Sequence, residues 1–390
     1  MSLVARMRPF TSTIFAEMSA LAVRTGAINL GQGFPDTDGP PSLLADAAAN
    51  ITAGINQYPP GPGVPELRAA VAEHQRRFYG VDLEPDAVLV TSGATEAIAA
   101  AVLALCETGD EVVTFQPTYD SYPATAAMAG ARLRAVPLRP PDFGFDPDEL
   151  RAAFSDRTRL VLLNSPHNPT GTVFDRAQLA LVAELAQRHD AVVVTDEVYE
   201  HMVFPDDGTD AEHVPISTLP GMAERTLTIS SAGKTFSVTG WKIGWVHGPP
   251  ALVAAVRAVK QFLTYVSGAP FQPAIAAALA LPDAFFTRLA TDLRRKRDLL
   301  SDGLRAAGFT VFRPAGTYFV VTDVAPLGFP DGMQFCLRLP ELAGVAAVPV
   351  SVFCADPALA TSLVRFTFCK RDEVLAEAAA RLAGLRAVTG

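Results

Sequence analysis

Short β-rich runs alternate with helical stretches between residues 88 and 246, and this alternation restricts the fold of the chain more than any other feature. The seven runs are Val88–Val90, Glu111–Phe115, Arg132–Val136, Arg159–Leu163, Val192–Thr195, Thr226–Ile229 and Ile243–Val246. Strands that alternate with helices favour a mostly parallel sheet with both faces covered. We therefore predict an α/β fold whose ligands lie beyond the carboxyl ends of the strands.

The residues after Pro249 predict a smaller α/β unit. A helix, a Gly/Pro loop at 267–270 and a long helix ending near Gly308 are followed by shorter strand-like runs. These runs are Tyr318–Val321, Val345–Val348 and Leu363–Phe368. Near the other end of the chain, Pro65 opens a helix. His74 shares the apolar face of that helix, so it is expected to be a packed core histidine rather than a ligand.

The composition is that of a compact soluble protein, because 49% of the 390 residues are apolar and 19% are charged. A net charge of −9 without a basic stripe argues against a nucleic-acid partner. Cys106, Cys336, Cys354 and Cys369 show no C-x-x-C spacing, which predicts no metal site and no disulfide framework and is typical of the cytoplasm. No apolar run reaches the length of a membrane span, so no membrane association is expected.

A lysine stands among small residues just after one predicted strand. Gly233-Lys234-Thr235 imitates the end of a nucleotide-triphosphate phosphate loop, but Thr228 occupies the place of the glycine which that motif requires. A second lysine, Lys242, follows eight residues later. A G-x-G at Gly31 also fails as a dinucleotide fingerprint, because the third glycine would fall on an aspartate.

Other polar motifs also follow predicted strands. Residues 91–96 join a strand to an Ala-rich helix whose start offers N–H groups and a positive dipole end to a phosphate, although an ordinary capped helix fits equally well. The turn at residues 164–171 contains two asparagines and two prolines. Asp196 ends a buried apolar strand, where a carboxylate is costly without a cation or donor. Arg365 lies inside an apolar strand, where it could bind a substrate carboxylate or form an internal ion pair.

Taken in order, these motifs resemble those of fold-type I, pyridoxal-phosphate-dependent class I/II aminotransferases over essentially the whole chain. The resemblance implies a mostly parallel seven-stranded sheet flanked by helices, with a smaller α/β domain built from both termini. It assigns residues 1–45 to an N-terminal arm and part of the small domain, 46–282 to the large cofactor-binding domain and 283–390 to the rest of the small domain.

The resemblance also implies a role for each motif residue. Lys234 would bind the cofactor aldehyde as a Schiff base and, once freed, move the substrate proton. Asp196 would keep the pyridine nitrogen protonated, which makes the ring an electron sink. Tyr199 and Asn168 would bond the phenolate oxygen of the ring, and Tyr119 would stack on it. The phosphate would be held by Ala94, Thr95, Ser231 and Lys242.

The substrate and subunit contacts are likewise implied by the resemblance. Arg365 would bind the substrate carboxylate, with Gly33, Asn168 and Phe15 beside it. A homodimer is implied, in which Tyr58 reaches the phosphate of the neighbouring subunit.

Two branches of the family share the run at residues 31–36: the N-succinyldiaminopimelate aminotransferases of lysine biosynthesis and the kynurenine/glutamine transaminases. Residues 56–63, 119–122 and 265–273 look more like the first branch. Three functions stay open. They are an aminotransferase for a long acylated diamino acid, a broad kynurenine/glutamine/methionine transaminase with possible β-elimination of cysteine conjugates, and a non-catalytic regulator.

Overall fold

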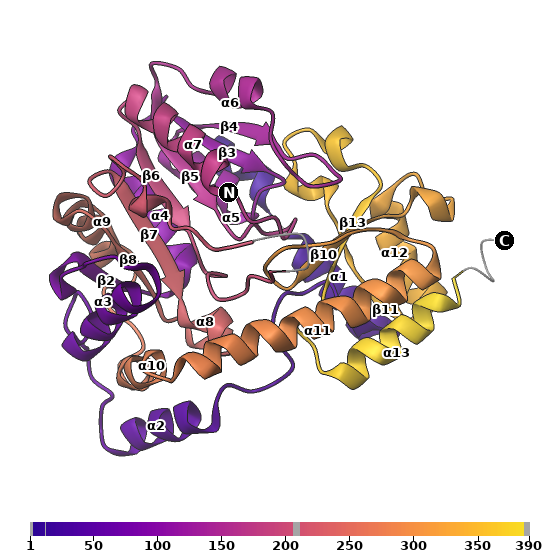
Figure 1. Ribbon diagram of the computed structural model, residues 1–390, viewed down its shortest axis with the longest axis horizontal. Helices are drawn as coiled ribbons and strands as arrows, with labels where there is room; N and C mark the ends of the chain where they lie inside the picture. The colour runs from indigo at the N-terminus through magenta and orange to yellow at the C-terminus, as the bar shows by residue number, and fades with distance from the viewer. Residues whose placement is uncertain (1–2, 12, 206–210, 386–390) are drawn as a thin grey trace.

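A computed structural model describes residues 3–11, 13–205 and 211–385 of the chain. In Figure 1 the large sheet and its helices lie at the left, and the smaller sheets with three helices lie at the right. The long helix α11 (Asp283–Ala307) runs from one part to the other. The domain limits expected at residues 45 and 282 stay a prediction. The parts of these ranges at 1–2, 12, 206–210 and 386–390 lie outside the described residues.

The large sheet has seven strands in the order β2-β8-β7-β6-β5-β3-β4. These strands are β2 (Val88–Thr91), β3 (Glu111–Gln116), β4 (Arg132–Pro137), β5 (Thr158–Asn164), β6 (Val192–Asp196), β7 (Thr226–Ser231) and β8 (Gly244–His247). All neighbours are parallel except β8, which runs antiparallel to both β2 and β7. The prediction of a mostly parallel seven-stranded sheet is therefore confirmed, with each strand within a few residues of its predicted place.

The described residues contain thirteen α-helices. They are α1 (Ile14–Thr25), α2 (Pro41–Thr52), α3 (Pro65–Tyr79), α4 (Gly93–Leu105), α5 (Ser121–Ala129), α6 (Pro147–Ala153), α7 (Arg176–Arg188), α8 (Ala232–Thr235), α9 (Pro250–Leu263), α10 (Phe271–Leu279), α11, α12 (Gly332–Ala343) and α13 (Asp372–Ala383). The ends follow local chemistry: Asp175 and Gln178 form a capping box before α7, and Gly308 ends α11 in the left-handed conformation.

Helices cover both faces of the large sheet because strand side chains alternate between them. Val193 and Val161 pack with α6 and α7, whereas Val194 and Leu162 pack with α4, α5 and α9. Both sets are buried, so the strands read as continuous apolar runs. The polar ends of the strands are left at one edge of the sheet.

The smaller part is built from both ends of the chain. Its four-stranded antiparallel sheet has the order β12 (Val348–Pro349), β13 (Leu363–Thr367), β10 (Phe319–Asp323), β9 (Thr310–Phe312). Close to the N-terminus, β1 (Ile28–Asn29) pairs in parallel with β11 (Val345–Ala346). The sequence did not predict β9, because three residues directly after a helix show no alternation of apolar and polar side chains.

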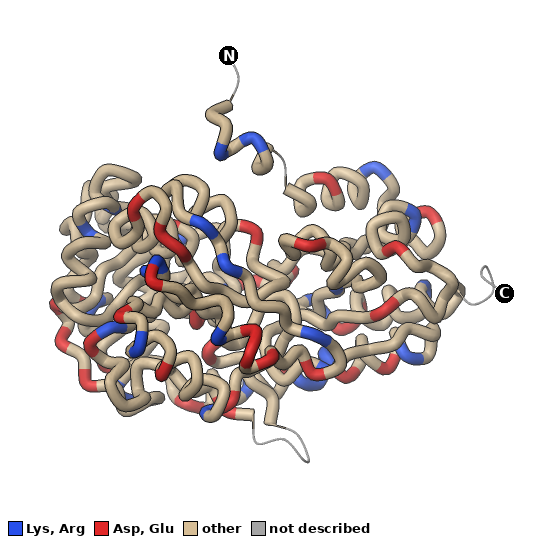
Figure 2. The backbone as a smooth tube through the Cα atoms, turned by 90° about the horizontal axis from the view of Figure 1, so that it is seen from above, with Lys and Arg blue, Asp and Glu red and all other residues tan. Residues whose placement is uncertain are grey.

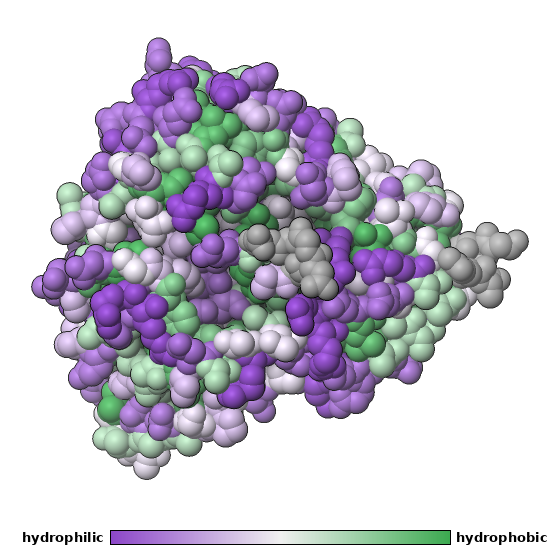
Figure 3. All heavy atoms as spheres, viewed as in Figure 1, coloured by the Kyte–Doolittle hydropathy of each residue, from purple (hydrophilic) through white to green (hydrophobic). Residues whose placement is uncertain are grey.

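The outer surface is mixed in charge and polarity. Figure 2 shows basic and acidic residues interspersed along the chain, and Figure 3 shows hydrophilic side chains over much of one face with apolar areas between them. The 3-10 helix η1 (Ala5–Phe10) projects from the body and has no buried residue. Within the described ranges no single helix has the length and apolarity of a membrane span, although α10 and α11, which meet at 90°, reach them as a pair.

Candidate active site

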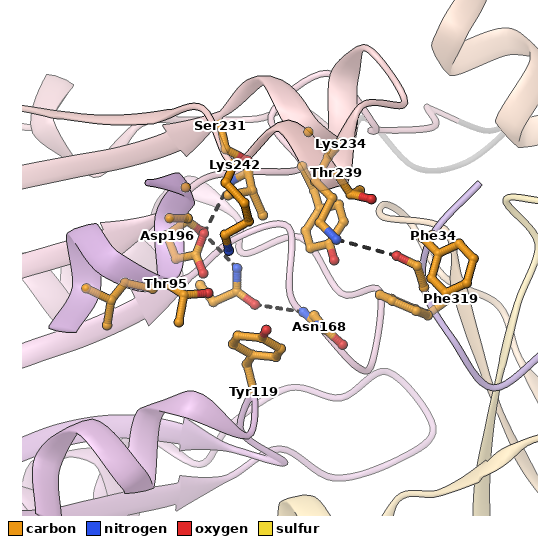
Figure 4. Close-up of a pocket in the computed structure, with 18 of the residues that line it drawn as sticks. Phe34, Thr95, Tyr119, Asn168, Asp196, Ser231, Lys234, Thr239, Lys242 and Phe319 are labelled. Carbon is orange, nitrogen blue, oxygen red and sulfur yellow. Dashed lines mark hydrogen bonds between the residues drawn. The ribbon is translucent and has the colours of Figure 1, made fainter. Parts of the chain in front are cut away.

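The polar motifs meet at the carboxyl edge of the large sheet, as the sequence predicted. In the register of β5 with β6, Asn164 stands beside Asp196, and Ser231 ends the next strand. A cavity of about 280 Å³ opens there (Figure 4). Twelve of the thirteen predicted site residues line it: Phe15, Gly33, Ala94, Thr95, Tyr119, Asn168, Asp196, Tyr199, Ser231, Lys234, Lys242 and Arg365.

Lys234 reaches this cavity from α8, a single helical turn where the sequence indicated a loop. Four residues are too few to show helical periodicity, which explains the difference. Its Nζ donates to the carbonyl oxygen of Gly33 at 3.4 Å and lies 5.8 Å from the ring centre of Tyr199. Burial lowers the pKa of Lys234 to about 8, against the opposing effects of Cys369 and Asp196. More of this amine is therefore neutral and nucleophilic near neutral pH than in an exposed lysine.

Asp196 is buried and held from two sides. Its Oδ2 accepts a hydrogen bond from the Tyr122 hydroxyl at 2.7 Å, and its backbone carbonyl accepts one from Asn164 Nδ2 at 2.8 Å. Burial raises the pKa of Asp196 to about 6, although the Tyr122 hydroxyl and the Val198 N–H both lower it. The carboxylate can therefore stabilise a cationic N–H group that enters the cavity.

Tyr122 is a site residue that the sequence analysis missed. It is separated from Asp196 by 74 positions, and the stretch that contains it, residues 119–122, served only to compare the two branches of the family. Only the run of two tyrosines at positions 119 and 122 could have drawn attention to it. Asn164 was noticed only as part of a turn, yet its Oδ1 also accepts the backbone N–H of Asn168 at 2.8 Å. Asn164 therefore connects the strand end that carries Asp196 with the turn that carries Asn168.

We expect Tyr122→Phe to lower the free energy of unfolding of the cofactor-free protein by about 1.5–3 kcal/mol, the usual worth of a hydrogen bond to a charged group. The aromatic ring of the variant still packs in the same place. The lost stability therefore comes from the buried Asp196 carboxylate, which no longer accepts this hydrogen bond. Chemical denaturation measures the change, with Tyr265→Phe, at a half-exposed tyrosine, as the matched control. Equal stability of the two variants would show that the hydroxyl does not stabilise Asp196.

Arg365 is buried, and no acidic side chain among the described residues forms an ion pair with it. Its Nη1 donates to Asn168 Oδ1 and its Nη2 to the Gly31 carbonyl, both at 2.9 Å. Its Nε has no hydrogen-bond partner within the described parts of the chain, and its guanidinium carbon lies 4.0 Å from the ring centre of Phe319. Burial lowers the pKa of Arg365 to about 10. This geometry favours the carboxylate-binding interpretation over the internal ion pair.

The start of α4 lies beside Lys242 at the cavity. Gly93 has a positive φ of 77°, and a Cβ placed on it would lie 3.1 Å from Lys242 Nζ. A Cβ on Gly244 would lie 2.6 Å from the backbone of Gly93, so only glycine lets β8 approach the helix so closely. Ala94 and Thr95 follow in the first turn, where the N–H groups and the dipole attract a phosphate.

The charges of the cavity match the group that the resemblance implies. Lys234, Lys242 and Arg365 line it against one carboxylate, Asp196, among the lining residues that the structure describes. Such a set suits an anionic phosphate, an acidic ring nitrogen and a substrate carboxylate. Figure 4 shows Lys234, Lys242 and Asp196 around one space, with Tyr119 at its lower side.

Tyr58 is the predicted site residue that lies elsewhere. It is 81% exposed, and its ring contacts that of Tyr265 with centres 5.6 Å apart. Its placement at a partner subunit's site stays a prediction. The sequence also missed Tyr318, whose hydroxyl donates to the Gly33 carbonyl at 2.6 Å beside Lys234, because no motif surrounds it.

Proteins of a known family resemble this chain in sequence and in fold. The family described as aminotransferase class I and II matches residues 25–382. The solved structure of N-succinyldiaminopimelate aminotransferase from Mycobacterium tuberculosis is 56% identical, with a TM-score of 0.95 over 98% of this chain and 100% of that chain. Methionine aminotransferase from Escherichia coli is 42% identical over 95% of each chain, and mouse kynurenine–oxoglutarate transaminase 3 is 37% identical over 95% of this chain and 87% of its own. The chain belongs to the class I and II aminotransferases, enzymes that use pyridoxal phosphate to move amino groups between amino acids and 2-oxo acids.

Proposed function

We propose that this aminotransferase acts on N-succinyl-diaminopimelate, with 2-oxoglutarate as the amino acceptor, in lysine biosynthesis. The observation that carries the proposal is the 56% identity, over 98% of the chain, to an enzyme described by that activity. The more distant methionine and kynurenine enzymes support a broad-specificity transaminase as the second candidate.

We propose that the cofactor is held at both ends of the cavity. Lys242, Ser231 and the first turn of α4 would hold its phosphate, with Thr95 as a hydroxyl donor. Asp196 would bind the protonated ring nitrogen at the other end. When bound, pyridoxal phosphate supplies an aldehyde and an electron-accepting ring. Tyr119 would cover one face of that ring.

Lys234 would have two tasks in this scheme. Its neutral amine would bind the aldehyde, and after release it would carry a proton between the substrate Cα and the cofactor. The Gly33 carbonyl, 3.4 Å from Nζ, orients the amine in the meantime. Tyr199, whose pKa burial raises, stays a neutral hydroxyl that can donate to the ring oxygen together with Asn168 Nδ2.

Arg365 would fix the α-carboxylate of the substrate. Asn168 and Gly31 hold its two Nη atoms in place, so the guanidinium is oriented before substrate arrives. Phe15 and Phe319 flank it and exclude water, which strengthens the ion pair.

We infer a preference for a long aliphatic substrate side chain from the residue at position 268. Gly268 packs against Ile243, a lining residue, and a Cβ on it would lie 2.2 Å from Ile243 Cδ1. A bulky side chain is therefore excluded at position 268. This position consequently offers an aromatic substrate no ring on which to stack. Each of the three cationic side chains among the described lining residues already has a proposed role. A distal succinyl carboxylate would therefore bind a cationic side chain outside this set.

We also propose a homodimer and a cytoplasmic location. The exposed Tyr58, Phe262 and Tyr265 and the projecting η1 are apolar or unburied features that a second subunit would cover. The four cysteines are unpaired, which suits a reducing compartment.

A donor panel tests the substrate proposal. With 2-oxoglutarate as acceptor, we expect kcat/KM to be highest for N-succinyl-diaminopimelate and several-fold lower for kynurenine and phenylalanine, because aromatic stacking is worth about 0.5–1.5 kcal/mol. The three donors are measured side by side on one enzyme preparation. If kynurenine is best by tenfold, the broad-specificity candidate replaces the succinylated substrate, while the aminotransferase assignment stands.

A further inference from the structure

A second group of titratable side chains is buried away from the active-site cavity. Four of the six histidines of the chain, His74, His201, His213 and His247, are all influenced by the charge of one carboxylate, Glu200. Glu200 lies four residues after Asp196, in the turn that follows β6. A cavity of about 350 Å³ borders the group and is lined by Glu200, His201 and His213. The proposed reaction uses none of these residues.

Three of these side chains converge on one point. His74 comes from α3, whereas Glu200 and His201 come from the turn, and one ligand atom from each lies within 4.8 Å of the others. The Nε2 atoms of the two histidines are 2.8 Å apart. Phe286 packs on both rings, with centres 5.5 Å from His74 and 4.4 Å from His201, so the imidazoles are held in place.

The carboxylate of Glu200 is only half satisfied. Its Oε1 accepts a hydrogen bond from Ser230 Oγ at 2.7 Å, but its Oε2 has no hydrogen-bond partner in the described part of the chain. The residue is only 5% exposed. The Tyr79 hydroxyl lies close to this carboxylate, because burial raises the pKa of Tyr79 and the charge of Glu200 and a hydrogen bond with it raise that pKa further. A buried carboxylate oxygen without a donor is costly unless a cation approaches it.

The protonation states suit a metal ligand set. Burial lowers the pKa of His201 to about 3 and lowers that of His74, so both imidazoles are neutral at pH 7 and can each offer a lone pair. Burial acts to raise the pKa of Glu200, whereas protonated His201 and His74 and the hydrogen bond from Ser230 act to lower it, and the pKa lies below its ordinary value. The neighbouring Glu197 is already occupied by His213 at 2.8 Å.

We propose that His74, His201 and Glu200 bind one divalent transition-metal ion of the Zn²⁺ type. Two imidazoles and one carboxylate form a ligand set that zinc takes in proteins, with a fourth position left for water. The adjoining cavity offers room for that water and a route for the ion. At bond lengths of about 2.0–2.1 Å, ligand atoms of a tetrahedral site lie roughly 3.3 Å apart, so the two rings need to separate by only about 0.5 Å.

A metal here would tie α3 to the segment that carries Asp196 and Tyr199. It would act as a structural link to the active site without touching substrate or cofactor. The alternative is that His74 and His201 simply share one proton through their hydrogen bond. That arrangement needs no ion, and the two interpretations differ in zinc stoichiometry. The sequence indicated a core histidine at 74 and no metal site because its partner lies 127 positions away.

The test uses the pyridoxal-phosphate-loaded enzyme after dialysis against a chelator. Zn²⁺ alone is added back, and bound zinc is measured by mass spectrometry and by competition with a chromophoric chelator. We expect one equivalent per subunit and a higher thermal transition temperature. In His74→Gln and His201→Gln, zinc binding should weaken at least about tenfold, because loss of outer-shell contacts alone costs about 10–100-fold. Co²⁺ in place of Zn²⁺ should give the absorbance of a four-coordinate site in the unaltered enzyme alone.

His189→Gln is the matched control, since that partly exposed histidine lies outside the group. It should bind zinc like the unaltered enzyme. If His74→Gln fails to fold, His201→Gln, at the less buried ring, carries the test, and retention of cofactor absorbance shows that the variant is folded. Substoichiometric binding by the unaltered enzyme, or equal binding in His201→Gln and His189→Gln, overturns the proposal.

Discussion

Replacing Lys234 with alanine is expected to abolish transamination while leaving the protein folded and still able to bind pyridoxal phosphate without a covalent bond. The amine is the proposed proton carrier, and general acid–base groups contribute typically about 10²–10⁴-fold. The fall in the transamination rate should exceed that range, because the covalent bond between the lysine and the cofactor is lost as well. Lys242, Ser231 and the start of α4 lie on other positions of the cavity and keep the phosphate site intact.

Cofactor content and single-turnover kinetics measure both parts of this expectation. Lys296→Ala serves as the control, because that lysine lies on α11 and pairs with Asp292, outside the cavity. It should leave rate and cofactor unchanged. The visible absorbance that depends on a covalent lysine–cofactor bond should vanish only in Lys234→Ala. Its persistence there would mean that another lysine carries the cofactor.

Arg365→Lys is expected to lower kcat/KM for amino-acid donors by about 10–150-fold, mainly through KM. This corresponds to the roughly 1.5–3 kcal/mol of a hydrogen bond to a charged group, since about 1.4 kcal/mol is tenfold. A lysine keeps the charge but loses the planar fork that Asn168 and Gly31 hold in place. Steady-state kinetics with at least three donors measures the change.

Arg371→Lys provides the comparison for this variant, because Arg371 is an exposed arginine whose Nε lies 3.6 Å from Asp36 at the surface. We expect its kinetics to match those of the unaltered enzyme. Unchanged kinetics in Arg365→Lys would place the carboxylate site elsewhere. A fall in kcat alone would instead show that Arg365 acts in the chemical step.

Local signals made the sheet and much of the site predictable. The inner strands β5 and β6 are nearly continuous apolar runs because both of their faces are covered, and Asp196 and Asn168 stand out as polar groups at or soon after the ends of these runs. Parallel strands bring their carboxyl ends to one edge, so residues far apart in sequence could be expected to meet there.

Groups that act through long-range contacts were not predictable. The hydrogen bond from Tyr122 to Asp196 and the pairing of Tyr318 with Gly33 join positions 74 and 285 residues apart. No local sequence pattern indicates such a long-range contact. The same holds for the His74–Glu200–His201 group, since helical spacing marks His74 only as a residue on a buried face.

Identifying the residue that holds pyridoxal phosphate tests the central claim most directly. The holoenzyme is reduced with borohydride, digested, and its peptides are analysed by mass spectrometry. We expect one phosphopyridoxyl group per subunit, on Lys234, with none on Lys242 or Lys260. A label on another lysine, or a reduced enzyme that carries no label, would contradict the proposed active site.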